Sequence, residues 1–257
     1  MITRSLPLAA RRAVAIGNMR AATGGEQDET SRKGQNMATA VKILMTEFVT
    51  HDVKRFIVER PPGYSFEPGQ ATEVSINTPE WKQEKRPFTF TSLADDLVLE
   101  FVIKGYPDHN GVTKQLHVLR PGDELLIRSV WGTIQYKGPG VFLAGGAGIT
   151  PFIAILRSLR KKNALAGNKL IFSNKTANDV ILEKEFEEML GDNFFRTLTR
   201  EKRDGYLHGR IDAEFLNRHV GDFSQNFYVC GANAFVNVIT EALRELGAKA
   251  DSVVVEK

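Results

Sequence analysis

The stretch from Val141 to Leu156 constrains the fold of this chain more than any other part of its sequence. Its four apolar residues Val141–Ala144 are typical of a strand that is buried on both faces of a parallel sheet. Three glycines follow within four residues, where the backbone must turn sharply and leave room for another group. A helix is expected next, with Thr150 as its N-cap and Pro151 as its first residue. Because free N–H groups and the helix dipole point at this turn, the pattern predicts a phosphate site.

The turn matches neither of the two common phosphate-binding patterns. It is not a spaced G-x-G-x-x-G fingerprint, and it is not a G-x-x-x-x-G-K-[ST] loop, since Pro151 stands near the place of a third glycine. A tight strand–helix turn that is packed closely for its own sake is the alternative. This stretch alone leaves both interpretations open.

Length and composition limit the possible fold classes and ligands of this chain. With 257 residues, of which 42% are hydrophobic and 25% charged, the chain has the make-up of a soluble protein with two modest domains. A net charge of +3 gives no indication of nucleic-acid binding. One cysteine excludes an intramolecular disulfide and a self-contained four-cysteine iron–sulfur or zinc site. No apolar run approaches the roughly 18–20 residues that span a bilayer. We therefore expect a monomeric, cytoplasmic protein without stable membrane insertion.

Residues 1–38 differ from the rest of the chain. Four arginines precede the first acidic residue, Glu26, and a polar stretch follows up to Asn36. We interpret this segment as a disordered arm. A basic, acid-poor start is also compatible with an organelle presequence, or with a gene start placed too early, because Met37 begins the regular part.

Residues 39–137 contain short strand patterns separated by turns, which together predict a small antiparallel β-barrel. One short helix is expected at Val112–Val118. Strands are expected at Val41–Thr50, Val53–Glu59, Ala71–Ile76, Arg86–Ser92, Leu97–Lys104 and Glu124–Val130.

Residues 138–257 alternate between strands and helices, which predicts an α/β domain with a doubly wound parallel sheet. Ligands of such sheets bind at the carboxyl ends of the strands. The expected strands are Val141–Ala144, Leu170–Ser173, Phe194–Thr199, Phe227–Cys230 and Ser252–Val255, and the expected helices are Pro151–Lys161, Ile181–Leu190, Ile211–Asn217 and Ala234–Leu246.

A second candidate site begins at Arg86-Pro-Phe-Thr89. A planar cofactor that carries a phosphate would use Arg86 for the anion, Phe88 as an apolar face and Thr89 as a hydrogen-bond partner. An edge strand with polar residues facing water explains the same residues and stays open. Further on, Gly111-Val-Thr113 starts the barrel's expected helix and supplies another N-terminus suited to phosphate.

Taken together, the motifs resemble those of the ferredoxin–NADP reductase superfamily. Arg86-Pro-Phe-Thr, Gly111-Val-Thr, Gly145-Gly-Ala-Gly-Ile-Thr-Pro-Phe and Cys230-Gly-Ala occur in the order typical of that family, and the similarity covers residues 40–257. Val102-Ile-Lys104 and the stretch from Ser173 to Leu182 are most similar to the NADH–cytochrome b5 reductase branch.

The resemblance implies an FAD-binding barrel, residues 39–137, followed by an NAD(P)-binding domain, residues 138–257. It further implies an enzyme that takes hydride from NADH or NADPH onto FAD and passes single electrons to a carrier protein, such as a ferredoxin, flavodoxin or cytochrome. A non-catalytic flavin- or nucleotide-binding regulatory module is one alternative. A flavin subunit of a larger iron–sulfur oxidoreductase is another.

The resemblance also implies which residues form the site. Thr89 would meet the flavin near N5 and Cys230 would sit by the reactive carbon of the nicotinamide, so these two are the candidate catalytic residues. The implied cofactor-binding residues are Arg86, Pro87, Phe88, Thr89, Val102, Ile103, Lys104, Tyr106, Gly111, Val112, Thr113, Gly146, Gly148, Thr150, Pro151, Asn174, Lys175, Cys230 and Gly231.

Three positions depart from the family's pattern. Phe88 stands where a tyrosine is usual, so one hydroxyl near the flavin is lost, and Ala232 replaces the usual proline after Cys-Gly. The sequence ends at Lys257 without the terminal aromatic that some relatives stack on the flavin. The expected flavin ring is therefore open to nicotinamide.

The end of the second expected strand bears on the choice of nucleotide. Asn174, Lys175 and Thr176 follow it, and no acid occurs before Asp179. An acid there binds the ribose 2′-OH, whereas a basic residue accommodates a 2′-phosphate. The similarity to the b5-reductase branch predicts NADH, with a modest preference because Lys175 tolerates the phosphate.

The remaining charged and imidazole groups carry less information. The five histidines show no ligand spacing, and no metal site is predicted. Arg157, Arg160, Lys161 and Lys162 are expected at a solvated helix end, where an acidic electron carrier would be attracted.

Overall fold

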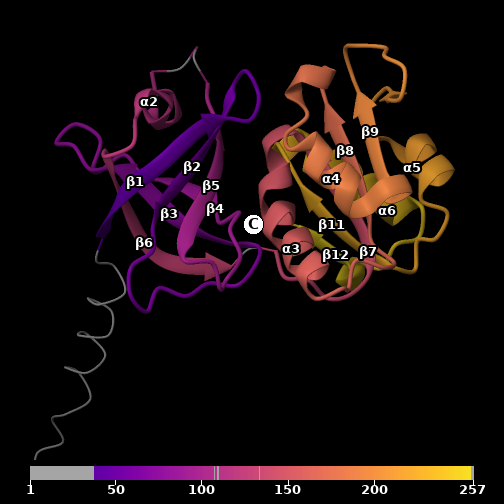
Figure 1. Ribbon diagram of the computed structural model, residues 1–257. Helices are drawn as coiled ribbons and strands as arrows, with labels where there is room; N and C mark the ends of the chain where they lie inside the picture. Colours follow the sequence, from indigo (N-terminus) through magenta and orange to yellow (C-terminus); the bar gives the residue numbers. More distant parts are fainter. Residues whose placement is uncertain (1–37, 107, 109, 133, 256–257) are drawn as a thin grey trace, which may run out of the picture. The chain divides into compact units, whose positions relative to one another are not determined.

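Two six-stranded sheets follow one another along the chain in the computed structural model, one antiparallel and one parallel (Figure 1). The structure describes residues 38–106, 108, 110–132 and 134–255. The expected N-terminal arm, residues 1–38, lies outside these ranges apart from its last residue. None of the helices in the described ranges is long and apolar enough to cross a membrane.

The first sheet is antiparallel throughout and has the strand order β4-β3-β6-β1-β2-β5. The sheet curls so far that its two edges meet. The amide of Thr91, just after β4, donates a 2.9 Å hydrogen bond to the carbonyl of Glu100 in β5. The strands are β1 (Thr39–Phe48), β2 (Val53–Glu59), β3 (Gln70–Ile76), β4 (Arg86–Thr89), β5 (Val98–Lys104) and β6 (Glu124–Gly132).

Aromatic rings fill the inside of this barrel. Phe90 stacks on Phe66 with 4.2 Å between ring centroids and tilts against Phe101 at 5.2 Å. The barrel's helix α2 (Val112–Val118) is fastened to β2 by Lys54, whose Nζ donates to the carbonyls of His117 at 3.1 Å and Leu119 at 2.7 Å. These carbonyls end the helix and have no partner within it, so Lys54 both closes α2 and fixes its place.

The second sheet is parallel and has the strand order β10-β9-β8-β7-β11-β12. Its strands are β7 (Gly140–Gly145), β8 (Lys169–Asn174), β9 (Phe194–Leu198), β10 (Leu207–His208), β11 (Asn226–Cys230) and β12 (Val253–Val255). The helices between them are α3 (Thr150–Lys161), α4 (Glu183–Leu190), α5 (Ala213–His219) and α6 (Asn233–Glu245).

Alternation along β7 explains why helices cover both faces of this sheet. Phe142 and Ala144 belong to a core shared with α3 and α4, whereas Val141 and Leu143 belong to a second core shared with α5 and α6. Successive side chains of a strand point to opposite faces, so a continuous apolar run needs cover on both.

The two sheets share part of one core. Val53, Val102 and Ile134 of the first half belong to the same buried cluster as residues of α3 and β7. The connecting segment is fixed by Tyr228 of β11, whose hydroxyl accepts from the amides of Lys137 at 2.9 Å and Gly138 at 3.1 Å and donates to the Gly138 carbonyl at 2.7 Å.

The expected fold class is confirmed, with an antiparallel barrel-like sheet followed by a doubly wound parallel sheet. Two local expectations were wrong. The sequence missed the two-residue strand β10, and Thr150 is not an N-cap. Residues Gly146–Ile149 already form a 3-10 turn that runs into α3, so Thr150 lies inside the helix and its hydroxyl donates to the Ala147 carbonyl at 3.1 Å.

Candidate functional site

A cavity of about 750 Å³ lies between the barrel and the carboxyl ends of the parallel strands. This volume is in the range that holds a cofactor or small-molecule substrate. The barrel wall includes Pro87, Phe88, Thr89, Val102, Ile103, Lys104, Tyr106, Thr113 and Trp131, and the sheet wall includes Gly145, Gly146, Gly148, Thr150, Asn174, Lys175, Thr199, Gly231 and Phe235.

Strands β4 and β5 supply most residues of the barrel wall. Thr89 is only 6% exposed and pairs across the sheet with Ala71, so its side chain is held at the cavity wall. On β5, the carbonyl of Ile103 contacts His117 Nε2 at 2.9 Å. A side chain at Gly105 would lie 2.6 Å from the His117 ring, which explains the glycine there. Burial lowers the pKa of His117, and this ring supports the wall without lining the cavity.

The sheet wall is a glycine turn that lies directly against a neighbouring strand. A Cβ at Gly148 would be 2.3 Å from the carbonyl oxygen of Cys230 at the end of β11, so only glycine fits. Gly146 has a φ of +53°, in the left-handed region that favours glycine. The turn follows β7, which lies between β8 and β11 where the strand order reverses. Crevices at such positions are the usual ligand sites of open parallel sheets.

In this wall, Asn174 is a buried residue whose side chain lacks hydrogen-bond partners within the described structure. It is 5% exposed, and neither the nitrogen nor the oxygen of its side-chain amide has a hydrogen-bond partner among the described residues. Its backbone carbonyl is well satisfied by the amide of Thr199 at 2.9 Å and the Thr199 hydroxyl at 3.2 Å. A buried polar group without a partner costs about 1–3 kcal/mol. We infer that a bound group supplies the missing partner.

A smaller, charged cavity of about 380 Å³ continues from the first. The two share Lys104, Lys175 and Asp179, and Arg200 lines the smaller one. Lys104 Nζ lies 2.5 Å from the carboxylate of Asp52. Although partial burial alone would raise it, the pKa of Asp52 is lowered because Lys104 donates this hydrogen bond.

Three potential metal ligands also meet at this cavity, although no metal site was predicted. Ligand atoms of His51, Asp52 and Asp179 lie within 4.8 Å of one another. Both carboxylates of this group already have partners. Asp52 is bound by Lys104, and Asp179 accepts from the amide and hydroxyl of Thr176 at 2.8 and 2.7 Å. A cation would have to compete with these contacts.

Most of the predicted site residues line the cavity, and five do not. Arg86 is exposed, with an ion pair to Glu84 at 3.7 Å and a hydrogen bond to the Lys85 carbonyl. Those absent from the described lining are Arg86, Gly111, Val112, Pro151 and Cys230.

Three of these five are buried. Val112 and Cys230 belong to the buried cores, Pro151 is buried at the start of α3, and Cys230 is 1% exposed. Their roles remain predictions.

Sequence analysis missed several residues that the structure brings to the site. Trp131 and Phe235 line the large cavity and Arg200 the small one. Arg200 follows β9 and its amide donates to the Lys175 carbonyl at 2.9 Å, so the two basic residues come from adjacent strand ends. The rule that carboxyl ends of neighbouring parallel strands share an edge could have found Arg200.

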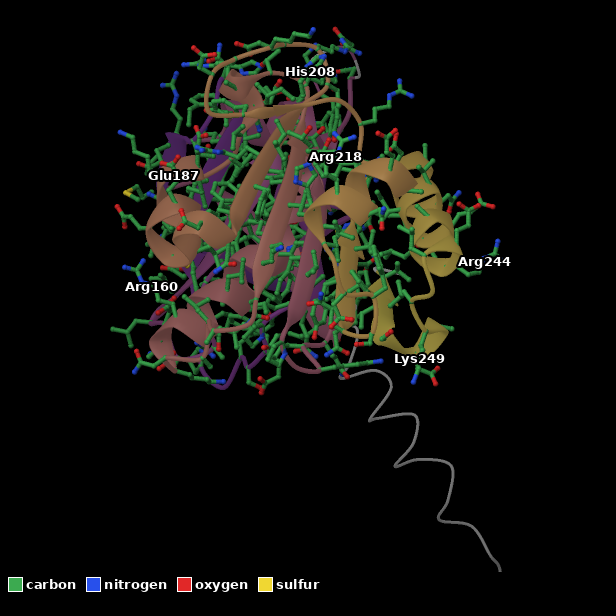
Figure 2. The ribbon with its side chains drawn as sticks, turned by 90° about the vertical axis from the view of Figure 1, so that its right-hand side faces the viewer. Arg160, Glu187, His208, Arg218, Arg244 and Lys249 are labelled. Carbon is green, nitrogen blue, oxygen red and sulfur yellow. The ribbon has the colours of Figure 1, made fainter. Side chains whose placement is uncertain are left out.

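The expectation for the basic end of α3 was partly wrong. Arg160, Lys161 and Lys162 are exposed, and Figure 2 shows Arg160 at the surface. Arg157 instead has only 18% of its side chain exposed and forms ion pairs with Glu100 and Glu185. Burial opposes its charge, but the contacts with Glu185 and Glu100 raise the pKa of Arg157 well above its usual value. It lies three to five residues, or about one helical turn, closer to the cavity end of α3 than the exposed basic residues do.

Comparison with known proteins gives the chain's relatives. A model of the oxidoreductase NAD-binding domain family matches residues 142–241. NADH-cytochrome b5 reductase 2-A of Vanderwaltozyma polyspora is 28% identical over 251 residues, which cover 86% of this chain and 84% of that protein. The ferredoxin–NAD(P)+ reductase component of the naphthalene 1,2-dioxygenase system of Pseudomonas putida is 22% identical, over 82% of this chain and 66% of its own.

The fold is also that of a solved reductase. The crystal structure of a ferredoxin NADP+ reductase from Neisseria gonorrhoeae, with bound FAD and NADP, superposes with a TM-score of 0.75. The match covers 85% of this chain and 98% of that one, at 20% sequence identity. At this identity the likeness establishes the two-domain fold.

The unpartnered amide gives a prediction about stability. Replacing Asn174 by the similarly shaped leucine removes a buried group that nothing in the described structure satisfies. We expect the free energy of unfolding of Asn174→Leu, measured by denaturant titration without added ligand, to equal that of wild type or exceed it by up to about 1 kcal/mol.

Asn168 is the matched control. It is 2% exposed, and its amide bonds Tyr136, Gly140, Ala164 and Leu165 at 3.2–3.3 Å. Asn168→Leu should lower the free energy of unfolding by about 1–3 kcal/mol. Equal losses for the two variants would mean that Asn174 is satisfied within the protein.

Proposed function

We propose that the chain is an NAD(P)H-dependent, FAD-containing reductase of the ferredoxin–NADP reductase superfamily, near its NADH–cytochrome b5 reductase branch. It would take hydride from the reduced nucleotide and pass electrons singly to a carrier protein. The observation that carries this proposal is the single cavity walled by the barrel strands on one side and the glycine turn on the other. Two ligands can meet there face to face.

The residues present fit a flavin on the barrel side. Phe88 and Val102 offer apolar surface to a ring, and Thr89, which is 6% exposed, adds a hydroxyl group to the same wall. When bound, FAD accepts two electrons as a hydride and releases them one at a time. Thr89 would orient the ring through its hydroxyl, and the apolar wall would exclude water from the reacting atoms.

The residues on the sheet side fit a dinucleotide. The glycine turn lets a ligand approach the backbone closely, and the N-terminus of α3 at Thr150 favours a phosphate. Asn174 would receive the hydrogen bonds that its amide lacks within the protein. Gly231, at the end of β11, lines the same cavity and would lie beside the nicotinamide.

The acceptor is proposed to be a one-electron carrier protein. The relatives named above are reductases of cytochrome b5 and of a ferredoxin, and both names describe transfer to another protein. A ferredoxin-, flavodoxin- or cytochrome-like acceptor is consistent with those names. The two alternatives, a regulatory flavin module and a subunit of an iron–sulfur enzyme, differ from it in what happens after flavin binds.

The first prediction for this function concerns the absorbance spectrum. Purified protein should carry, or gain on addition of FAD, a flavin spectrum, and NADH or NADPH under anaerobic conditions should bleach it. A soluble one-electron acceptor such as ferricyanide should then restore the oxidised spectrum. Flavin binding without bleaching would favour the regulatory module, and co-purification of a cysteine-rich protein would favour the iron–sulfur subunit. A protein that takes up no flavin refutes the proposal.

Arg86 is proposed to hold a phosphate of the flavin, although it does not line the described cavity. About half of its side chain is exposed and its ion pair with Glu84 is long, at 3.7 Å, so the guanidinium is available. Arg86→Ala should weaken FAD binding by roughly ten- to a hundredfold in an equilibrium titration, because a charge-assisted hydrogen bond contributes about 1.5–3 kcal/mol. Lys85→Ala removes the adjacent cation, which pairs with Glu73, and should leave the affinity unchanged. Equal affinities for Arg86→Ala and wild type would assign the phosphate to another residue.

The choice of nucleotide is proposed to depend on two cations. The sequence predicts NADH, but the structure adds Arg200 beside Lys175 in the small cavity. The acid at this edge, Asp179, is already engaged by Thr176, so it is less available for a ribose hydroxyl. We therefore propose that NADPH is used at least as well as NADH.

Steady-state kinetics test this choice. Lys175→Ala and Arg200→Ala should each lower kcat/KM for NADPH by roughly tenfold while changing that for NADH less than twofold, because each removes one contact to the 2′-phosphate. Lys202→Ala, an exposed cation outside the described lining, is the control. Equal losses with both nucleotides would place the two residues elsewhere on the dinucleotide.

A further inference from the structure

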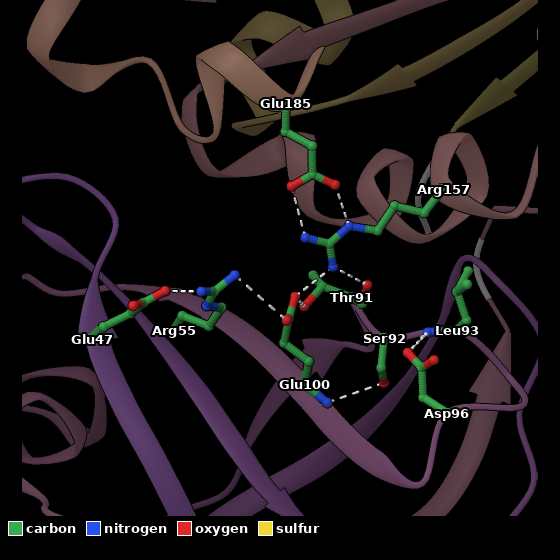
Figure 3. A network of polar contacts seen from close by, with 9 residues as sticks. All are labelled: Glu47, Arg55, Thr91, Ser92, Leu93, Asp96, Glu100, Arg157 and Glu185. Atoms are coloured by element: carbon green, nitrogen blue, oxygen red, sulfur yellow. Dashed lines mark hydrogen bonds and ion pairs between the residues drawn. The ribbon is translucent and has the colours of Figure 1, made fainter. Parts of the chain in front are cut away.

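A chain of charged groups connects the barrel to helices α3 and α4 (Figure 3). It runs from Glu47 through Arg55 to Glu100 in the barrel, and then through Arg157 of α3 to Glu185 of α4. Carboxylates and guanidinium groups alternate along it. None of these five residues lines the described part of the cavity.

Arg157 is the member that links the two sheets. Its Nε and one terminal nitrogen bond the two oxygens of Glu185 at 2.5 and 2.8 Å, a bidentate pair within the parallel-sheet domain. Its other terminal nitrogen donates to Glu100 Oε1 at 2.6 Å and to the carbonyl of Thr91 at 2.8 Å, both in the barrel. The planar fork of an arginine fits this arrangement, whereas a lysine has one nitrogen and cannot span it.

The barrel contacts of Arg157 are themselves fixed. The Thr91 hydroxyl donates to the same Glu100 oxygen at 2.8 Å, and the Glu100 amide donates to Ser92 Oγ at 3.0 Å. Glu100 is 8% exposed and Thr91 fully buried. Arg157 therefore binds the barrel at the place where its two edges meet.

Each end of this link lies close along the chain to residues that line a wall of the cavity. Along α3, Arg157 follows the cavity residue Thr150 by seven positions, two helical turns, so both lie on one face about 10 Å apart. Along β5, Glu100 precedes the cavity residue Val102 by two positions and shares its side of the strand. Thr91 follows the cavity residue Thr89 by two positions, just beyond the end of β4.

We propose that Arg157 is a positioning residue for hydride transfer, which sets the separation of the barrel wall from the glycine-turn wall and thereby the approach of the two bound rings. This inference rests on the proposed reductase function. It concerns distance and orientation, so it predicts a larger effect on the reduction step than on the binding of either ligand. A misplacement of about 1 Å can slow a reaction by roughly a hundredfold.

A second ion pair between the barrel and the parallel-sheet domain provides a control that distinguishes positioning from simple electrostatic attraction. Lys161, one turn further along α3, pairs with Asp95 of the barrel, but both side chains are more than half exposed. Exposed pairs contribute little and hold no fixed geometry. Lys161→Ala therefore removes a cross-junction ion pair without removing the buried fork, and Arg160→Gln removes a neighbouring surface cation.

The decisive experiment compares Arg157→Lys and Glu100→Gln with these two controls by stopped-flow reduction of the flavoprotein. We expect the limiting reduction rate at saturating nucleotide to fall tenfold or more in Arg157→Lys and in Glu100→Gln. The dissociation constants for FAD and for the nucleotide should change less than threefold. The double variant should be no slower than the slower single variant, because both changes break one link. Lys161→Ala and Arg160→Gln should reduce at the wild-type rate.

A measurement without added ligand tests the structural link between the two sheets separately from the enzyme assignment. Hydrogen exchange in the segment 90–101, which includes the Thr91 amide bonded to Glu100, should be at least tenfold faster in Arg157→Lys. Exchange in α6, on the far face of the sheet, should not change. If wild type is not reduced by either nucleotide, the proposed function fails while this readout still reports on the link.

The inference is overturned by wild-type reduction rates in both Arg157→Lys and Glu100→Gln. It is equally overturned by losses of rate that only follow lost flavin occupancy. If Arg157→Lys does not fold, Glu100→Gln alone decides, since it changes one atom and leaves the fork to Glu185 intact.

Discussion

The cavity depends on one backbone contact, the glycine turn after β7 lying directly against the end of β11. No side chain fits between Gly148 and the Cys230 carbonyl, where a Cβ would approach to 2.3 Å. This contact keeps the carboxyl edge of the sheet open at the point where the strand order reverses. Because the turn runs straight into α3 through a 3-10 segment, it also aims the helix N-terminus at the opening.

The junction between the two sheets combines two kinds of interaction with different effects. Val53, Val102 and Ile134 bury apolar surface in the core of the parallel-sheet domain, which provides attraction but little directional preference. The buried charges of Arg157, Glu100 and Glu185 lose hydration, so their contribution to stability is small even with good geometry. Their hydrogen bonds are directional, however, and they specify how the two sheets sit against each other.

Stability and ligand binding make opposite demands on the two buried asparagines of the second domain. Asn168 bonds four neighbouring groups and fastens the start of β7. Asn174 is buried to a similar degree, yet its amide has no partner in the described structure. An unpaired buried amide lowers the stability of the folded chain. Because Asn174 borders the cavity, its amide is placed to bind a ligand there. The contrast locates the ligand side of the sheet without any ligand being present.

The sequence by itself determined the order of elements apart from the two-residue strand β10, because the features that encode this order are local. The apolar run Val141–Ala144, the glycine turn and the strand patterns of residues 39–137 each lie within a few residues, so periodicity predicts them. Only the tertiary structure decided which charges meet. Arg157 looked like its exposed neighbours, since nothing within one helical turn records that Glu100 and Glu185 approach it. Lys175 and Arg200 come together for the same reason, because adjacency in a parallel sheet joins residues that the chain holds far apart.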